Sequence, residues 1–200
     1  VVEKILDSGI ASLRISTETH DAARFASIRG GSWPRVQAGI ERLLARRAER
    51  GLQRPSVGLS VTVLASTLDD LPGVFALYEQ LGLDGGIAIQ PLNRMPGYAQ
   101  GYPAPFQHEF LQRERHEASY LRHMNSQAYQ RIARQAASSD GSSRHFYEHL
   151  FQPSPEEQAQ GRLSTCPWLA RGLSMDRHGR LAPCCMVKDA ADSFATLGQA

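Results

Sequence analysis

Residues 166–185 read Cys166-Pro-Trp-Leu-Ala-Arg-Gly-Leu-Ser-Met-Asp-Arg-His-Gly-Arg-Leu-Ala-Pro-Cys184-Cys185 and hold all three cysteines of the 200-residue chain. Apolar and polar residues alternate over 173–176, and Gly179 ends a cluster of turn residues because it accepts a positive φ at no steric cost. Residues 180–183 then run back along the first strand. The pattern predicts a β-hairpin that carries Arg177-His178 in its loop and brings thiols together.

Three kinds of cysteine site are compatible with this hairpin. A disulfide is disfavoured because the count is odd, two cysteines are adjacent, and no signal segment indicates an oxidising compartment. A zinc site would need Cys166, Cys184, Cys185 and His178. However, a hairpin puts His178 at its tip, roughly 20 Å of extended chain from Cys184, which returns opposite Arg171. An iron–sulfur cluster would find only some of its thiolate ligands here.

Composition sets broad limits on function. With 42% hydrophobic residues, the chain is long enough to bury a core of one domain or somewhat more. A formal net charge of +2 with interspersed acids and bases gives no reason to expect nucleic acid or an anionic membrane as partner. Since no apolar run reaches the roughly 20 residues that span a bilayer, and the start Val-Val-Glu-Lys-Ile lacks signal architecture and Met, we expect a cytoplasmic fragment.

The first 92 residues alternate helical and strand patterns, which favours βα units around a parallel sheet. We expect helices over 2–8, from Ser32 to about Arg50, and after a cap formed by Thr67, Asp69 and Asp70. We expect strands over 12–16, 57–64 and 86–92. The arginines at 42, 46, 47 and 50 lie on the polar side of their helix, which indicates a solvated face.

The middle of the chain carries fewer signals. Residues 93–105 are rich in proline and glycine and are typical of a loop or linker. A polar helical stretch is predicted from Phe106 to about Ala137, where His116 and His123 share a face. Because no ligand pair occurs at i and i+4, this stretch is interpreted as a solvated helix or a cap rather than a metal site.

The cysteine run resembles a known iron–sulfur module. Cysteine, twelve residues, glycine, four residues and cysteine, with Asp-x-x-Gly before the return strand and Pro-Cys after it, resembles the opening of the SPASM extension of radical S-adenosylmethionine enzymes. The upstream segments are similar to the same family in the same order: Ile15-Ser16-Thr17-Glu18, then 27–31 around Arg29, the strand and helix over 63–72, and Ile89-Gln90-Pro91-Leu92.

This resemblance implies an α/β fold, the second half of a partial (β/α)6 barrel over 1–105. A helical linker or cap over 106–160 and the β-hairpin start of a SPASM domain over 161–200 would follow. It implies an enzyme that cleaves S-adenosylmethionine to a 5′-deoxyadenosyl radical and abstracts a substrate hydrogen. The substrate would be a peptide or a small molecule, and the electron donor flavodoxin or ferredoxin. No catalytic residue is assigned.

Site residues follow from the same resemblance. Ser16 would contact the ribose or methionyl part of S-adenosylmethionine, and Arg29 would pair with the methionyl carboxylate. Pro91 and Leu92 would lie against adenine. Cys166 and Cys184 would help ligate an auxiliary [4Fe-4S] cluster. Each of these residue types suits its role, since guanidinium groups bind carboxylates through two parallel bonds and a hydroxyl at a strand end is held rigidly.

The sequence also departs from the family. The three-cysteine loop of the radical-generating cluster, the glycine-rich motif and the later SPASM cysteines are missing, so this chain alone is expected to be inactive. Glu18-Thr19 stands where Asp-Gly is commoner, and Thr67 where Asn often occurs. Cys185 replaces an acidic residue of the sulfatase-maturing branch. The alternative is a non-catalytic α/β binding module with a small structural zinc site.

Overall fold

The computed structural model describes residues 1–92, 101–138, 143–145, 151–152, 174–175, 180–182 and 195–196. The chain forms two compact units, Val1–Gln152 and Pro153–Ala200. The first unit contains helices α1 (Val2–Asp7), α2 (Ala22–Arg29), α3 (Trp33–Glu49), α4 (Leu71–Gln80), α6 (Arg113–Met124) and α7 (Gln127–Ser138), and 3-10 helices η1 (Ala65–Asp70) and η2 (Ala104–His108). Its strands are β1 (Ser12–Thr17), β2 (Ser56–Val63), β3 (Ile87–Pro91), β4 (Leu111–Gln112), β5 (Arg144–His145) and β6 (Phe151–Gln152).

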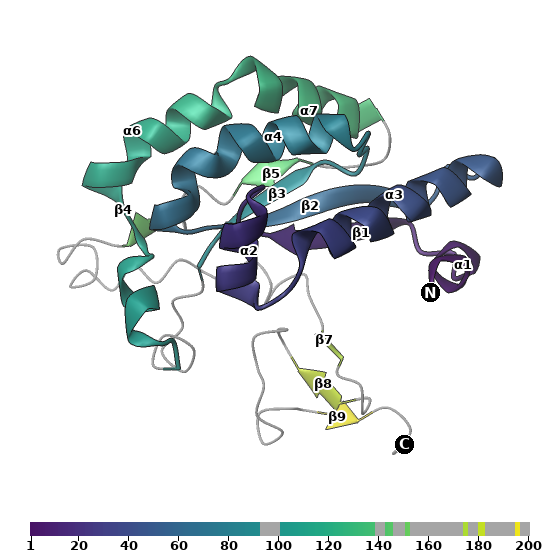
Figure 1. The fold of residues 1–200 in the computed structure, drawn as a ribbon, viewed down its shortest axis with the longest axis horizontal. Coiled ribbons are helices and arrows are strands. Elements are labelled where there is room, and N and C mark those ends of the chain that lie inside the picture. The colour runs from purple at the N-terminus through teal and green to yellow at the C-terminus, as the bar shows by residue number, and fades with distance from the viewer. Residues whose placement is uncertain are drawn as a thin grey trace. The chain divides into compact units, whose positions relative to one another are not determined.

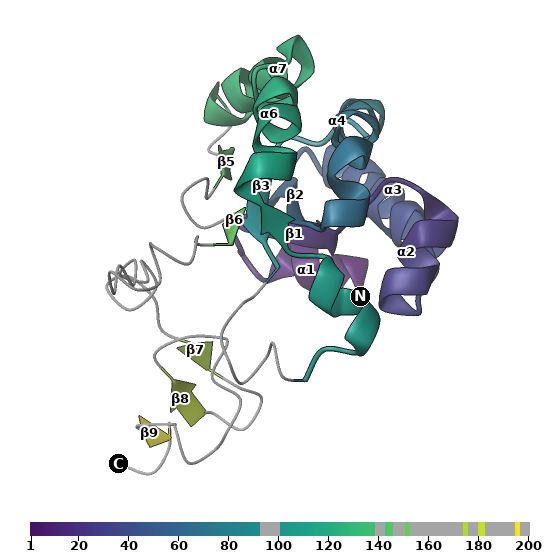
Figure 2. The same ribbon diagram turned by 90° about the vertical axis from the view of Figure 1, so that its left-hand side faces the viewer.

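A four-stranded parallel sheet in the order β1-β2-β3-β5 forms the centre of the first unit. Figure 1 shows α4, α6 and α7 along one side of this sheet, and Figure 2 shows the same layering from the end of the strands. The three strands expected from the sequence are present, and the α/β class is confirmed. Neighbouring strands follow chain order, an arrangement that occurs in barrel walls and in open sheets alike.

Strand β2 shows which face of the sheet is buried. Val57, Leu59, Val61 and Val63 alternate along the strand and are at most 1% exposed, whereas Ser60 and Thr62 between them are half-buried. The apolar face packs in one core with side chains of α3 and α4, including Leu43, Val74, Phe75 and Tyr78. The other face carries the polar residues of β2.

Several elements differ from expectation. Helix α2 was not expected, although Asp21 caps it by accepting the Arg24 N–H and Gly30 ends it with φ 68°. The cap expected from Thr67, Asp69 and Asp70 is correct only in position: Asp70 is the N-cap residue of α4 but its side chain makes no cap hydrogen bond, and Thr67 and Asp69 lie inside η1. The continuous helix expected from Phe106 is divided into η2, β4, α6 and α7.

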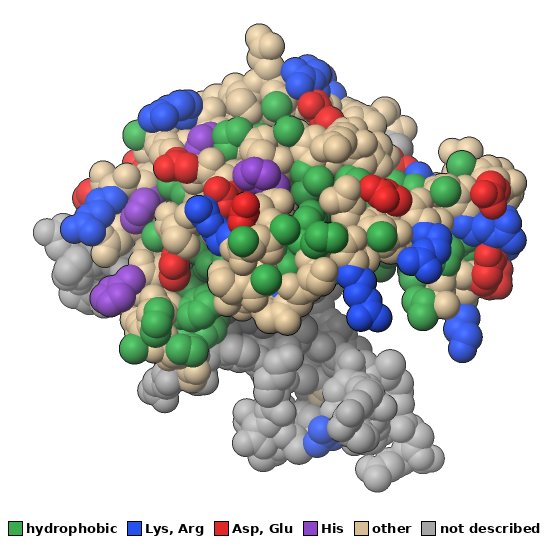
Figure 3. All heavy atoms as spheres, in the orientation of Figure 1, with side chains coloured by type: hydrophobic (Ala, Val, Ile, Leu, Met, Phe, Trp, Pro, Cys, Tyr) green, Lys and Arg blue, Asp and Glu red, His purple; other side chains and the backbone are tan. Residues whose placement is uncertain are grey.

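The arginine side of α3 serves as an interface with α1. Arg46 pairs with Glu3 at 2.6 Å, and Arg50 pairs with Glu3 at 3.0 Å and Asp7 at 2.8 Å. These pairs hold α1 beside α3 at the surface. Over the view in Figure 3, acidic and basic side chains are interspersed instead of separated by sign.

The second unit contains a three-stranded antiparallel sheet, β7 (Ser174–Met175), β8 (Arg180–Ala182) and β9 (Ala195–Thr196). The expected hairpin is confirmed by the pairing of β7 with β8. Its register differs by one residue from that expected, since Ser174 lies opposite Ala182 instead of Leu181. This register does not fit the two-residue loop inferred from Arg177 and His178, which lie outside the described residues.

Candidate functional site at the carboxyl edge of the sheet

The carboxyl ends of β1, β2 and β3 meet at one edge of the parallel sheet, which we call the carboxyl edge. Thr17 is the last residue of β1 and pairs with Val61, while Val63 and Pro91 pair at the ends of β2 and β3. In parallel α/β sheets, ligands bind at this edge because the loops after the strands can vary without disturbing the core. A ligand site is therefore expected at the carboxyl edge.

Ser16 lies on the less buried face of the sheet near this edge. It is exposed and lies in register with the half-buried Ser60 of β2, which in turn pairs with Ala88 of β3. One step further along, the Gln90 amide donates to the Thr62 hydroxyl at 3.2 Å. The row of small polar groups leaves the Ser16 hydroxyl accessible.

Arg29, at the end of α2, is joined to the end of β1 through Glu18. Its Nε donates to Glu18 Oε2 at 2.7 Å and its Nη2 to Oε1 at 2.5 Å, a two-pronged ion pair. The Glu18 side chain is 7% exposed and that of Arg29 37%. Because Glu18 follows Ser16 by two positions, the ion pair fixes Arg29 beside the strand end that carries Ser16.

The turn after β1 is held by its own threonines. The buried Thr17 hydroxyl donates to the Thr19 carbonyl at 2.6 Å, and the Thr19 Oγ accepts the Asp21 N–H at 3.0 Å. Asp21 then caps α2 through the Arg24 N–H at 2.7 Å. These bonds lead the chain directly from β1 into α2 and thereby set the position of Arg29.

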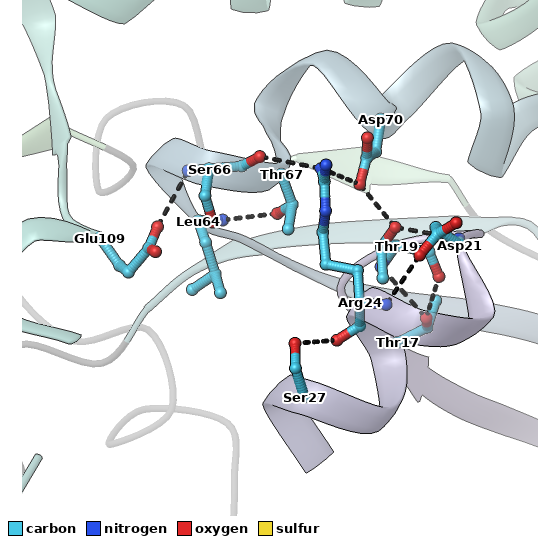
Figure 4. A network of polar contacts seen from close by, with 10 residues as sticks. All are labelled: Thr17, Thr19, Asp21, Arg24, Ser27, Leu64, Ser66, Thr67, Asp70 and Glu109. Atoms are coloured by element: carbon cyan, nitrogen blue, oxygen red, sulfur yellow. Dashed lines mark hydrogen bonds and ion pairs between the residues drawn. The ribbon is translucent and has the colours of Figure 1, made fainter. Parts of the chain in front are cut away.

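A second carboxylate, Asp70, ties this turn to the segment after β2. Its Oδ2 accepts the Thr19 hydroxyl at 2.5 Å and Arg24 Nη1 at 2.7 Å, while the same Nη1 reaches the Ser66 carbonyl at 3.1 Å (Figure 4). Two opposite charges and two neutral groups therefore satisfy one another. Arg24 Nη1 is therefore bound by groups of the protein itself, whereas Arg29 is bound by Glu18 through Nε and Nη2.

Glu109, which follows η2, connects to the same segment. Its carbonyl accepts the Ala65 N–H at 2.9 Å, and its carboxylate Oε2 accepts the Ser66 N–H at 2.9 Å (Figure 4). In the same segment, the Tyr102 ring lies against the rings of Phe106 and Phe110, with centroids 6.2 and 6.3 Å apart. Residues 101–110 are thus bound to the carboxyl edge through η1.

Pro91 and Leu92 are half-buried at the end of β3, at the same edge. These apolar groups and the polar groups of β1 lie at the same edge of the sheet, with β2 between them. The structure brings Ser16, Arg29 and Pro91 to one edge, and this is an arrangement that suits a ligand with a charged end and an apolar end.

The expected metal ligands, Cys166 and Cys184, lie outside the described residues, and so do Gly179 and Cys185. Among the residues that the structure describes, no three His, Cys, Asp or Glu side chains gather closely enough for a metal ion. His116 and His123 do not approach each other as ligands: His116 Nδ1 accepts the Gln112 N–H at 2.8 Å, and His123 faces Ser119 and Asp69. In the same part of the chain, no helix is long and apolar enough to cross a membrane.

Sequence reasoning missed the two carboxylates that organise the edge. Glu18 was noted only as a departure from the family pattern, and Asp70 was assigned to a helix cap. Glu18 directly follows β1, and Asp70 ends the short 3-10 helix that follows β2. Acidic residues in the segments after two parallel strands are a signal that could have indicated them, because such strand ends converge at one edge.

No family model matches this chain, and neither a curated protein nor a solved structure shows significant similarity to it.

Proposed function

We propose that this chain is part of a radical S-adenosylmethionine enzyme of the SPASM type, which modifies a peptide or a small metabolite. The observation that supports the proposal is that Ser16, Arg29 and Pro91 all lie at the carboxyl edge, with Arg29 joined through Glu18 to the strand that bears Ser16. These are the residues that the resemblance assigns to the cofactor.

The residues present suit S-adenosylmethionine. The exposed Ser16 hydroxyl can hydrogen-bond to a ribose, and the outer edge of Arg29 can accept a carboxylate. Pro91 and Leu92 offer a half-buried apolar surface for a purine. When bound beside a reduced iron–sulfur cluster, S-adenosylmethionine supplies a 5′-deoxyadenosyl radical that removes a hydrogen atom from the substrate.

Binding of S-adenosylmethionine to the chain tests the site, measured by isothermal titration calorimetry under anaerobic conditions. Arg29→Gln should weaken binding about 10- to 100-fold, since charge-assisted hydrogen bonds contribute about 1.5–3 kcal/mol. Arg35→Gln, an exposed arginine of α3, is the matched control and should leave the affinity within about two-fold. Equal effects of the two substitutions would remove Arg29 from the site.

Metal content tests the assignment of the cysteines. We expect the chain to bind iron and sulfide after anaerobic reconstitution, and Cys184→Ala to lower the bound iron. In the intact enzyme the same substitution should spare the radical-generating cluster. Iron content unchanged by Cys184→Ala would contradict the ligand assignment, and stoichiometric zinc without iron would favour the binding-module alternative.

A further inference from the structure

We infer that Glu18 is a positioning residue that occupies one edge of the Arg29 guanidinium and presents its other edge to a single carboxylate, that of an α-amino acid group. This inference rests on the proposed function. Position 18 is not among the residues that the resemblance assigns to the cofactor, and Glu18 stands there where Asp is commoner.

The geometry of the ion pair divides the guanidinium into two edges. A guanidinium has five N–H donors in a planar fork. Glu18 takes the Nε–H and one Nη2–H, at 2.7 and 2.5 Å, and so occupies the side edge completely. The end edge, between Nη1 and Nη2, keeps one donor on each nitrogen. These two parallel donors match the two oxygens of another carboxylate.

Because Glu18 is buried and Arg29 is partly exposed, Glu18 is the fixed partner of the ion pair and Arg29 is the partner that a ligand can reach. The Glu18 side chain is 7% exposed and accepts Arg29 through both oxygens, whereas the Arg29 side chain is 37% exposed. In the described part of the chain, no residue bonds to Arg29 Nη1. The carboxylate therefore holds a guanidinium whose free edge reaches solvent.

Charge sets the class of ligand. Glu18 neutralises Arg29, so the free edge offers directed hydrogen bonds without a net positive charge. Phosphate can also use paired arginine donors, but its larger negative charge gains little Coulomb attraction from an arginine that Glu18 already neutralises. A zwitterionic α-amino acid group carries its own ammonium and needs only the two directed donors. The pair should therefore favour the methionyl end of S-adenosylmethionine over inorganic anions.

The neighbouring arginine at this edge is already occupied. Arg24 Nη1 is bound by Asp70 and by the Ser66 carbonyl, and Asp70 also accepts the Thr19 hydroxyl. Arg24 and Asp70 thus form a closed structural pair. They provide a matched control, since both carboxylates pair with an arginine of α2 at the same edge of the sheet.

The test compares two nucleosides that differ by the amino acid part. S-adenosylhomocysteine carries the carboxylate and 5′-methylthioadenosine lacks it, and calorimetry on the full chain gives both affinities. Glu18→Gln should weaken S-adenosylhomocysteine about 10-fold or more and change 5′-methylthioadenosine less than two-fold. Glu18→Asp, which keeps the charge, should recover part of the loss. Asp70→Asn should leave the ratio of the two affinities unchanged.

A second measurement uses inorganic phosphate as competitor. Phosphate should not displace S-adenosylhomocysteine from the wild type but should compete with it in Glu18→Gln, where Arg29 regains a net charge. A general loss of structure would lower both nucleoside affinities together and would not create phosphate binding. Thermal unfolding of each variant, followed in parallel, gives the change in stability separately.

The outcomes separate this inference from the proposed function. If the wild type binds neither nucleoside, the proposed function fails and the inference with it. If the wild type binds both nucleosides but Glu18→Gln leaves their ratio unchanged, the proposed function stands and Glu18 has no positioning role. A loss confined to the carboxylate-bearing nucleoside supports the inference.

Discussion

Gly58, in the buried strand β2, shows how closely two backbones meet beside the sheet. A Cβ at this position would lie 2.4 Å from the Gly86 carbonyl oxygen and 2.8 Å from the Gly85 carbonyl carbon. Because both neighbours are backbone atoms, no side-chain rotation can relieve the contact. The loop before β3 is held there by Asp84, whose carboxylate accepts the Val57 N–H at 2.7 Å. Glycine at 58 is therefore required by close approach.

Gly58→Ala should lower the free energy of unfolding by about 2–3 kcal/mol, the upper part of the range for overpacking. Gly39→Ala is the matched control, since a Cβ there has no neighbour within 4 Å and the position is inside α3. The control should be neutral or stabilising by up to about 1 kcal/mol. Urea denaturation of both variants measures the difference, and equal stabilities would contradict the close approach.

For single residues, the sequence predicted which side chains take part in polar contacts better than it predicted which groups they contact. Arg29 was expected to bind a carboxylate, and the structure provides one, from Glu18, which no pattern in one sequence can pair with it. Thr67 was expected to start a helix. Instead its hydroxyl accepts the Leu64 N–H at 3.2 Å, because the chain first forms a 3-10 turn. Such pairings depend on tertiary contacts rather than on local spacing.

Among the elements, η1 and α6 are linked by a small polar cluster. The Ser119 hydroxyl donates to Asp69 Oδ1 at 2.9 Å, and His123 Nε2 lies 3.5 Å from the same oxygen. These contacts lower the pKa of Asp69, first through the Ser119 hydrogen bond and then through that of His123. Ser119 donates to the carboxylate, so the arrangement is a structural link and not an activated serine.

The lowered pKa gives stability a dependence on pH. Because Asp69 is more acidic in the folded chain, its contribution is fully present above its unfolded pKa of about 3.9 and is lost as pH falls through the folded pKa. The side chain is 87% exposed, so solvent screening limits this contribution to about 0.5 kcal/mol. Unfolding free energies of wild type and Asp69→Asn should therefore differ at pH 6, and the difference should shrink as the pH falls below about 4. Ser119→Ala should reduce the difference, and a difference that grows on acidification would contradict the link.

Most elements of the first 92 residues could be predicted because their hydrophobic periods are clear. The strands expected over 12–16, 57–64 and 86–92 occur as β1, β2 and β3. Helix α2 was missed because only Phe25 is buried in it, so it has almost no apolar period. The break at Asn125 and Ser126 between α6 and α7 was missed for another reason: no glycine or proline marks it, and each helix has its own buried positions, Tyr120 and Met124 in α6 and Tyr129, Ile132 and Ala136 in α7.

At the scale of the whole first unit, the parallel order β1-β2-β3 follows from the alternation of strands and helices. The fourth strand could not be predicted, because β5 has two residues and pairs with β3 only through Ala88 and Ile89. The chain reaches β5 only after α6 and α7, so its pairing with β3 depends on how those helices pack. The candidate site was predicted in part: its residues were named, whereas the carboxylates that hold them were not.

The packing of α7 decides whether the first unit unfolds as one. Ile132 of α7 is completely buried in the same core as the β2 valines, and the Tyr129 ring packs at a tilt against Phe75 of α4 with centroids 5.5 Å apart. This core also includes Trp33, at the start of α3, which is 3% exposed. Loss of packing at α7 should therefore lower the stability of the part of the core around Trp33.

Ile132→Ala should lower the free energy of unfolding by about 2–4 kcal/mol, since it removes buried methyl groups and leaves a cavity. In a Trp168→Phe background, fluorescence of Trp33 reports the transition from α3. Leu121→Ala is the control, because Leu121 of α6 is 37% exposed; it should change the free energy of unfolding by less than about 0.5 kcal/mol. A shift of the Trp33 transition equal to the shift in helical circular dichroism would show that α7 and α3 unfold together. A Trp33 transition unaffected by Ile132→Ala would mean that α6 and α7 unfold apart from the sheet that carries Ser16 and Glu18.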